Sequence, residues 1–231
     1  MFELILVRHG QTPCTVEGRF CGRHEARLTP VGQRMAVLAA RHPRLDRVDR
    51  VVTSPARRAA ETAAALGGAR SVPVTTDPRL QELSFGEWES RLPAEVDPDT
   101  HQAWERDPAL CAPPGGETAL EVLARAVACV RDEQAAGGSV AIVSHKAPIR
   151  LILCFFLGLS PSRYRDLGNV TVGSVSALRL TARGVSLTAL GDVAHLPAPW
   201  RADPDRATTG PDSFGAALAA IRRTAERPAT R

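Results

Sequence analysis

The sequence has few of the features that mark nucleic-acid-binding, membrane-spanning or disulfide-rich proteins. Lys146 is its only lysine, and its aromatic residues are three tryptophans, one tyrosine and six phenylalanines. The arginines are spread along the chain and form no basic stripe between aromatic side chains, so the formal charge of +4 does not indicate nucleic-acid binding. The longest apolar segment, residues 149–159, contains an arginine and is too short to cross a bilayer. We therefore expect neither a nucleic acid nor a membrane as a partner.

Two further absences limit the possible chemistry. The five cysteines are odd in number and form no C-x-x-C pair, which argues against a disulfide framework and against a zinc site. No G-x-x-x-x-G-K-[ST] segment occurs, which excludes a fused P-loop kinase. The first apolar run begins almost at Met1 and leaves no room for a signal peptide, so we expect a cytoplasmic protein.

The features that are present begin with a short apolar run that ends in an unusual way. Residues 4–7 show no polar alternation, which predicts a strand covered on both faces. The run is followed at once by Arg8, His9 and Gly10. In open parallel sheets, ligands bind beyond the carboxyl ends of the strands, so the run is predicted to present a cation and an imidazole to a ligand. A surface loop that happens to contain both residues is the alternative.

Strands and helices alternate along the chain. Apolar runs predict strands at 4–7, 48–53, 72–75, 140–144, 172–180 and 185–190. Helical patterns lie between them at 31–41, at 56–66 before Gly67 and Gly68, at 118–135, and after Pro148. This alternation predicts an α/β fold, a three-layer α/β/α sandwich with a mostly parallel central sheet. The short turn at 181–184 predicts that the last two strands form an antiparallel hairpin at the sheet edge.

Two segments do not follow the alternation. Residues 92–116 are proline-rich, and we interpret them as an inserted excursion that covers one end of the sheet, with a short helix near 101–106. After residue 196 the prolines indicate a linker, followed by a short helix that carries Phe214, Leu218 and Ile221. We therefore predict a main domain over 1–196 and a C-terminal linker and helix over 197–231. That helix would dock on the domain, dock on a second copy in a homodimer, or remain disordered, and we favour docking.

Groups that suit a phosphate follow four predicted strands or lie close to strand ends. They are Arg8 and His9, Arg58, Glu82, and His145. Arginines can bind phosphate oxygens through charge-assisted hydrogen bonds, and an imidazole can attack phosphorus. A second imidazole can stabilise the developing charge, and a carboxylic acid can protonate the leaving oxygen. The set therefore predicts phosphoryl transfer that needs no metal and no other cofactor.

The motifs around these residues resemble those of the histidine phosphatase superfamily, which includes phosphoglycerate mutases and small-molecule acid phosphatases. Seven motifs match in order: RHGQT at 8–12, GRFCG and LTPVG at 18–32, TS…RA…TA at 53–63, E…GEWE at 82–89, PGGET at 114–118, VSH at 143–145 and DVAHL at 192–196. The resemblance implies a phosphoglycerate mutase-like fold and a nucleophilic His9. It also implies that Glu82 is the proton donor and that Arg8, Arg58 and His145 form the phosphate pocket.

The chain departs from the family pattern at two positions. Thr15 stands where many members have an asparagine that contacts the phosphoryl group, and its hydroxyl could donate a hydrogen bond instead. Lys146 stands where members usually have glycine, and it would either contact an anion or point to solvent. With Cys21 and Gly22, these residues are predicted to contact the substrate.

We predict a metal-independent phosphatase that hydrolyses a small phosphorylated metabolite through a phosphohistidine on His9. The alternative is a cofactor-dependent phosphoglycerate mutase. The mutases, however, carry a much longer insertion between the acidic residue and the second histidine, and the interval between Glu82 and His145 is short. A non-catalytic module that binds a phosphorylated ligand is a third hypothesis, disfavoured because the whole catalytic set is present.

Overall fold

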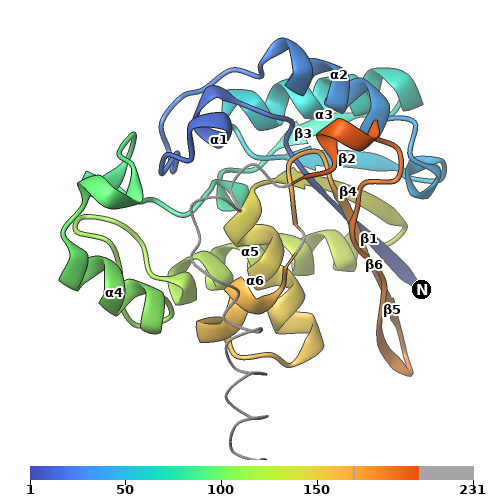
Figure 1. The fold of residues 1–231 in the computed structure, drawn as a ribbon. Helices are drawn as coiled ribbons and strands as arrows, with labels where there is room; N and C mark the ends of the chain where they lie inside the picture. The colour runs from blue at the N-terminus through green and yellow to red at the C-terminus, as the bar shows by residue number, and fades with distance from the viewer. Residues whose placement is uncertain (169, 203–231) are drawn as a thin grey trace, which may run out of the picture.

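The computed structural model describes residues 1–168 and 170–202 and contains one central sheet (Figure 1). The strand order is β3-β2-β4-β1-β5-β6. Neighbours among β1 to β4 pair in parallel, whereas β5 pairs antiparallel with β1 and β6 antiparallel with β5. The bounds are β1 (Phe2–Arg8), β2 (Arg50–Thr53), β3 (Val74–Thr76), β4 (Ser139–Ser144), β5 (Val175–Thr181) and β6 (Gly184–Asp192). The predicted antiparallel hairpin at the sheet edge is confirmed.

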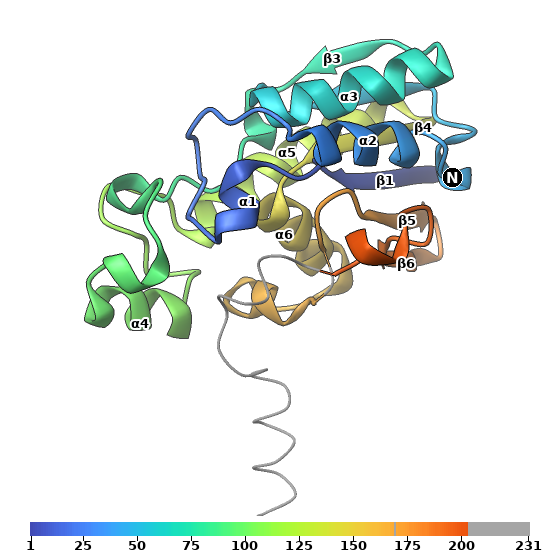
Figure 2. The ribbon, with the colours of Figure 1, turned by 45° about the horizontal axis from the view of Figure 1, so that its top comes forward.

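Helices cover both faces of the sheet, as predicted for a three-layer sandwich. They are α2 (Pro30–Ala39) and α3 (Arg57–Arg70) on one face, and α5 (Ala119–Ala136) and α6 (Lys146–Leu157) on the other (Figures 1 and 2). Strand β1 serves both layers, because Leu4 and Leu6 pack on the α5–α6 side while Ile5 and Val7 pack on the α2–α3 side. Burying each such side chain contributes about 1.5–3 kcal/mol, so the centre of the sheet is a rigid support for the residues directly after β1.

The end of α3 differs from the prediction. The helix continues through Gly67 and Gly68 and ends at Arg70, with Ser71 in the left-handed conformation. A Cβ on Gly67 would lie 2.3 Å from Cγ2 of Val74, so the glycine lets β3 approach the helix. Close packing between the two elements explains this glycine, which is not a stop signal.

Two other helix boundaries also differ. Helix α6 starts at Lys146, before Pro148, because proline is tolerated in the first turn of a helix. Helix α1 (Pro13–Glu17) was not predicted, since five residues are too few to show a periodic pattern. Its start is marked locally by Thr12, whose side chain accepts a hydrogen bond from the Thr15 N–H.

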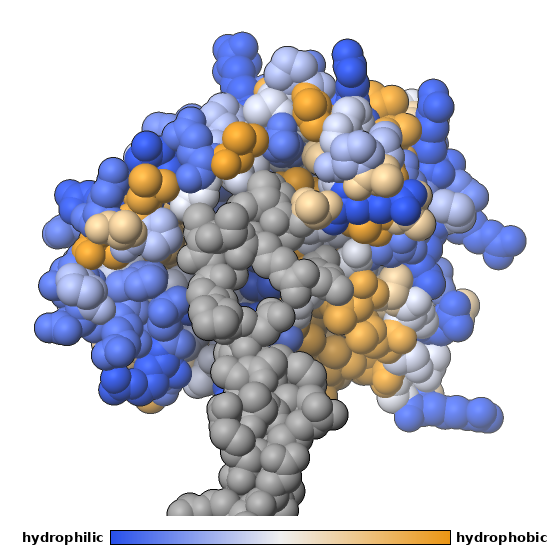
Figure 3. Space-filling model, in the orientation of Figure 1, coloured by the Kyte–Doolittle hydropathy of each residue, from blue (hydrophilic) through white to orange (hydrophobic). Residues whose placement is uncertain are grey.

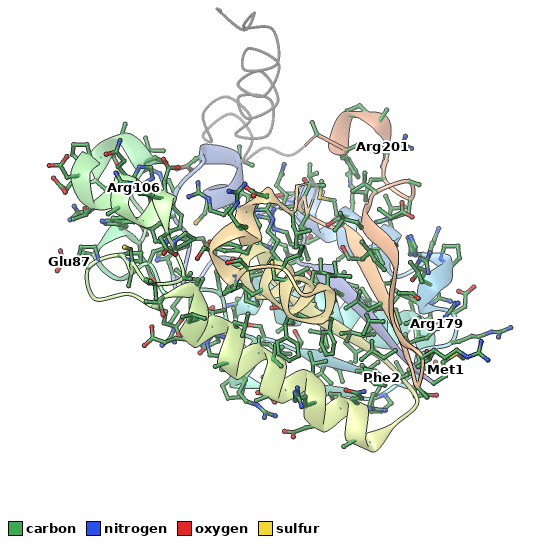
Figure 4. All side chains as sticks on the ribbon, turned by 90° about the horizontal axis from the view of Figure 1, so that it is seen from below. Met1, Phe2, Glu87, Arg106, Arg179 and Arg201 are labelled. Atoms are coloured by element: carbon green, nitrogen blue, oxygen red, sulfur yellow. The ribbon has the colours of Figure 1, made fainter. Side chains whose placement is uncertain are left out.

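The predicted excursion lies beyond the carboxyl end of β1. It contains η4 (Pro93–Glu95) and α4 (Pro98–Arg106), and Figure 2 shows α4 beyond α1 at that end of the sheet. Figure 4 places the labelled Glu87 and Arg106 at this end of the molecule, with Phe2 and Arg179 at the opposite end. Aromatic rings join the excursion to the segments beside it: Phe20, Phe85, Trp88, His101 and Trp104.

The last described residues follow the sheet edge. Strand β6 exposes Val185, Leu187 and Leu190, and Figure 3 shows an apolar area beside the β5–β6 hairpin. The short turn η6 (Ala198–Trp200) follows, and the predicted C-terminal helix lies outside the described residues. The domain boundary and the homodimer therefore stay predictions. None of the helices described has the length and apolarity to span a bilayer.

Candidate active site

His9 is held directly after β1 by its own backbone. Its N–H donates to the carbonyl of Ser144 at the end of β4, and its carbonyl accepts from the N–H of Gly173. The imidazole Nδ1 lies 2.8 Å from the carbonyl oxygen of Gly10. Because a carbonyl oxygen only accepts, Nδ1 must carry the proton in this contact. The neutral ring therefore has its lone pair on Nε2, the nitrogen that can act as a nucleophile.

Gly10 allows the turn after His9 to pack against α2. A Cβ on Gly10 would lie 2.4 Å from the carbonyl oxygen of Gly32, and a Cβ on Gly32 would lie 2.1 Å from that of Gln11. The N–H of Gly10 also donates to the Thr62 hydroxyl of α3 at 3.2 Å. A glycine directly after His9 suggests room for a phosphate, but the structure shows that Gly10 gives helix α2 room.

Two buried arginines flank this turn. Arg58, in the first turn of α3, donates from Nη2 to the carbonyl of Gly22 at 2.7 Å and from Nη1 to that of His24 at 3.0 Å. Its Nε is buried and has no hydrogen-bond partner among the described residues. Arg8, the last residue of β1, donates from Nη1 to the carbonyl of Val170 at 2.9 Å. Both guanidinium groups are thus fixed by the backbone, which suits them to bind a phosphate.

His145 lies behind His9, with the two ring centroids 5.0 Å apart. It is fully buried, and its Nε2 lies 2.8 Å from the hydroxyl oxygen of Ser54. Burial lowers the pKa of His145 well below its usual value, and the charges of Arg58 and its neighbours lower it further, so the ring is neutral. If the Ser54 hydroxyl donates to Nε2, the proton resides on Nδ1, which has no partner among the described residues. That N–H could donate a hydrogen bond to a phosphate oxygen.

Glu82 is a buried carboxyl group beside the start of α6. Its Oε1 accepts hydrogen bonds from the N–H groups of Leu83 at 2.8 Å and Ala147 at 3.3 Å. Burial raises the pKa of Glu82 above its usual value, although the Leu83 N–H and nearby arginines oppose this effect. A carboxyl group that keeps its proton to higher pH is suited to be a general acid.

One cavity brings most of the predicted residues together. The predicted residues that line it are Arg8, His9, Thr15, Cys21, Gly22, Arg58, Glu82 and Lys146. His145 is buried directly behind His9 and is not among the residues that line this cavity. The volume of this cavity, taken as the space that the centre of a water molecule can occupy, is about 160 Å³. In the described part of the chain, no group of three or more His, Cys, Asp or Glu side chains is placed to hold a metal ion.

Comparison with known proteins decides the family. A family model described as histidine phosphatase superfamily (branch 1) matches residues 4–193, which is most of the chain. The chain belongs to the histidine phosphatase superfamily. The resemblance predicted from the motifs is therefore confirmed.

Several proteins of known sequence or structure are similar to this chain. A glucosyl-3-phosphoglycerate phosphatase of Mycolicibacterium vanbaalenii is 34% identical over 195 residues, covering 77% of this chain and 83% of the relative. A protein of Yersinia enterocolitica named a probable phosphoglycerate mutase is 32% identical over 209 residues, covering 86% of this chain and 97% of the relative. The solved structure of a mycobacterial glucosyl-3-phosphoglycerate phosphatase in complex with VO3 has a TM-score of 0.75 and 29% identity, covering 81% of this chain and 97% of the other. The chain spans about half the length of the first curated relatives that it matches, among them a bifunctional protein of Mycobacterium tuberculosis.

The structure bears on both departures from the superfamily pattern. Thr15 lines the cavity, but its hydroxyl donates to the carbonyl of Thr12 at 2.8 Å and accepts from the Thr12 N–H at 2.9 Å. Its single hydroxyl proton is therefore already used, and the expected hydrogen bond to a phosphoryl group would require this one to break. Lys146 is half-buried and lines the cavity, which agrees with the anion-contact alternative rather than with a side chain in solvent.

The cavity also has a wall of residues that were not among the predicted site residues, although Arg19, Phe20 and Phe85 lie within the motifs at 18–32 and 82–89. Its aromatic members are Phe20, Phe85, His101, Trp104 and Tyr164, and its further cations are Arg19, Arg150 and Arg165. Arg165 stacks on Trp104 with 4.5 Å from its guanidinium carbon to the ring centroid, and it donates to Glu105 at 2.8 Å. The i, i+4 spacing of Lys146 and Arg150 on one helix was the available sequence signal for part of this wall.

The late DVAHL motif supports the backbone of His9. His195 Nε2 lies 3.1 Å from the carbonyl oxygen of Gly173, whose N–H donates to the carbonyl of His9. Asp192 accepts from the N–H of Ala194 and lies 3.3 Å from Nε2 of His42. The turn that contains this motif therefore holds the backbone of His9 through Gly173.

Proposed function

We propose that this protein is a phosphatase that hydrolyses a small phosphomonoester through a phosphohistidine on His9. The observation that carries the proposal is the state of His9, whose Nδ1–H is held by the Gly10 carbonyl so that the lone pair is on Nε2. Arg8, Arg58 and Glu82 line the same cavity. The names of the phosphatase relatives agree with this function.

In the first half of the proposed reaction, Nε2 of His9 attacks phosphorus and the bond to the leaving oxygen breaks. The guanidinium groups of Arg8 and Arg58 and the Nδ1–H of His145 stabilise the charge on the equatorial oxygens. Glu82 gives its proton to the leaving alcohol oxygen and becomes a carboxylate. The products are a free alcohol and a phosphohistidine.

In the second half, water hydrolyses the phosphohistidine. The Glu82 carboxylate takes a proton from the water as the oxygen attacks phosphorus, and the N–P bond breaks to return the electron pair to Nε2. Inorganic phosphate leaves, and Glu82 is protonated again. Because two buried arginines supply the positive charge, we propose that no step uses a metal ion.

The outer part of the cavity supports an inference about the alcohol. Trp104 and Phe20 provide apolar ring surfaces, and Lys146 and Arg150 provide positive charge. Arg165 is paired with Glu105, which also lines the cavity. We infer that the preferred substrates have a leaving alcohol that carries a second negative group.

A hydrolysis screen tests the proposal. Phosphomonoesters with neutral and anionic alcohols are offered at several pH values, and phosphate release is measured for the wild type and for His9→Ala. The wild type should release phosphate and yield an acid-labile, base-stable phosphoprotein, and His9→Ala should do neither. A fully active His9→Ala protein would refute the mechanism.

The mutase hypothesis has one supporting observation, the name of the Yersinia relative. The same screen distinguishes it, because a mutase would isomerise a phosphoglycerate without releasing phosphate.

A further inference from the structure

Arg125, on helix α5, uses a complete set of hydrogen bonds to hold the segment that carries Glu82. Its Nη1 donates to the carbonyls of Arg79 and Gln81, both at 2.7 Å, and its Nη2 donates to the carbonyl of Glu82 at 3.0 Å. Its Nε and Nη2 donate to the two carboxylate oxygens of Glu117 at 3.0 and 2.9 Å. A guanidinium group has five N–H donors, and all five have acceptors here.

Glu117, from the PGGET motif, is saturated in the same way. Beside Arg125, it accepts from the N–H of Ser84 at 2.9 Å and from Nη2 of Arg23 at 3.1 Å. Its own N–H donates to the carbonyl of Ser84. Burial alone would raise the pKa of Glu117, but the hydrogen bonds and charge of Arg125 bring that pKa below its usual value, so the group is ionised. The pair therefore fixes the chain on both sides of Glu82.

The same pair also reaches the segment that holds Arg58. Arg23 lies between Gly22 and His24, whose carbonyls accept the two hydrogen bonds from Arg58. Glu117 thus connects the backbone around the proton donor to the loop that fixes a phosphate-binding arginine. Side-chain exposure is only 18% for both Arg125 and Glu117, so solvent screens their interaction little.

We propose that Arg125 and Glu117 are positioning residues for general acid catalysis, which hold the Glu82 carboxyl group where it can reach the leaving oxygen. Neither needs to touch the substrate, and neither lines the cavity. The hydrogen bonds to Oε1 of Glu82 come from Leu83 on this segment and Ala147 on α6, so a shift of the segment changes the place of the carboxyl group relative to α6. This inference rests on the proposed function, since it assumes that Glu82 donates a proton.

The test uses Arg125→Met and Arg125→Lys, with Arg131→Met as a matched control. Arg131 is exposed on the same helix. Lysine keeps the charge but has three donors and no planar fork, so it cannot reproduce five hydrogen bonds. For each variant, kcat and KM are measured with an alkyl phosphate and with p-nitrophenyl phosphate, whose leaving group needs little protonation.

Misplacing a catalytic group by 1 Å can cost about 100-fold, so Arg125→Met should lower kcat/KM for the alkyl phosphate by about 10- to 100-fold. The kcat/KM for p-nitrophenyl phosphate should change by less than about 3-fold, because it reports only the steps up to the phosphohistidine and this leaving group needs little protonation. The basic limb of the pH profile should move to higher pH, since the charge of Arg125 lowers the pKa of Glu82. Arg125→Lys should show a smaller loss of the same kind, and Arg131→Met should match the wild type.

Equal losses on the two substrates with an unmoved pH profile would overturn the inference and leave Arg125 a purely structural residue. If Arg125→Met does not fold, Arg125→Lys and Glu117→Gln decide by the same ratio of the two kcat/KM values. Failure of the proposed function looks different, because Glu82→Gln itself would then show no preference between the substrates.

Discussion

Replacing Glu82 with glutamine isolates the proton from the rest of the site. Glutamine has nearly the same shape, and its amide oxygen can still accept the N–H groups of Leu83 and Ala147 that Oε1 accepts now. The local fold should therefore persist while the acidic proton is lost. General acid catalysis typically contributes about 10²- to 10⁴-fold, which corresponds to about 3–5 kcal/mol in the activation barrier.

The assay compares two leaving groups on the Glu82→Gln enzyme. With an alkyl phosphate, kcat/KM, which reports only the steps up to the phosphohistidine, should fall by about 10²- to 10⁴-fold, whereas with p-nitrophenyl phosphate it should fall by less than about 10-fold. Glu87→Gln, an exposed neutral replacement nearby, should leave both values unchanged. Equal losses of Glu82→Gln on both substrates would refute the assignment of Glu82 as the acid.

The same variant should change stability with a definite sign. Burial raises the pKa of Glu82 in the folded state, so the wild type loses stability as pH rises through that raised pKa, because the unfolded chain ionises first. Glutamine cannot ionise, so Glu82→Gln should have a higher Tm than the wild type above this range. Below a pH of about 4 the carboxyl group is protonated in both states and the two melting curves should converge. A variant with the lower Tm at pH 8 would show that the folded protein stabilises the charged carboxylate.

Three further changes test individual contacts. Ser54→Ala removes the hydrogen-bond partner of Nε2 on buried His145, so urea titrations should show a free energy of unfolding lower by about 1–3 kcal/mol, and KM should rise. An unchanged free energy of unfolding would rule out that hydrogen bond. Gly32→Ala places a Cβ 2.1 Å from a backbone oxygen and should lower the free energy of unfolding by about 1–3 kcal/mol or more. Gly68→Ala has nothing within 4 Å of the new Cβ and should stabilise α3 by about 0.5–1 kcal/mol, so similar Tm shifts for the two variants would contradict this packing argument. Thr15→Ala breaks a capping box, so it should lower the free energy of unfolding by about 0.5–2 kcal/mol and change KM by less than about 3-fold. A large rise in KM would mean that the hydroxyl does bind the phosphoryl group.

The elements of the fold could be predicted from local sequence because their signals are local. Apolar runs of four to nine residues predicted strands near the places of the six strands in the described part of the chain. The central strands β1, β2 and β4 show this most directly, since a strand buried on both faces needs no polar alternation. Helix α2 starts after Thr29 and α5 after Thr118, whose side chains accept from N–H groups three residues later, so the signals for these starts are also local. The boundary errors at Gly67 and Pro148 arose where a distant contact or a tolerated first-turn position outweighed the local rule.

The individual site residues were also visible in the sequence, because the motifs mark them one by one. The sequence alone determined that an arginine and a histidine follow a buried strand, and it predicted a set of charges that suits a phosphate. It could not determine which hydroxyl protons are already used, and Thr15 shows the consequence, since its hydrogen bonds to Thr12 depend on the geometry of a five-residue helix.

Only the tertiary structure decided how the site is held together. Ser54 and His145 are separated by 91 positions, and Arg125 holds carbonyls that lie 43 to 46 positions earlier in the chain. Such partners share no local pattern, because they meet only when parallel strands and their covering helices bring distant segments to one end of the sheet. Short motifs therefore predict which residues carry the chemistry of this protein. Burial and contacts that form only in the folded chain set the tautomer of His145, the protonation of Glu82 and the place of its carboxyl group.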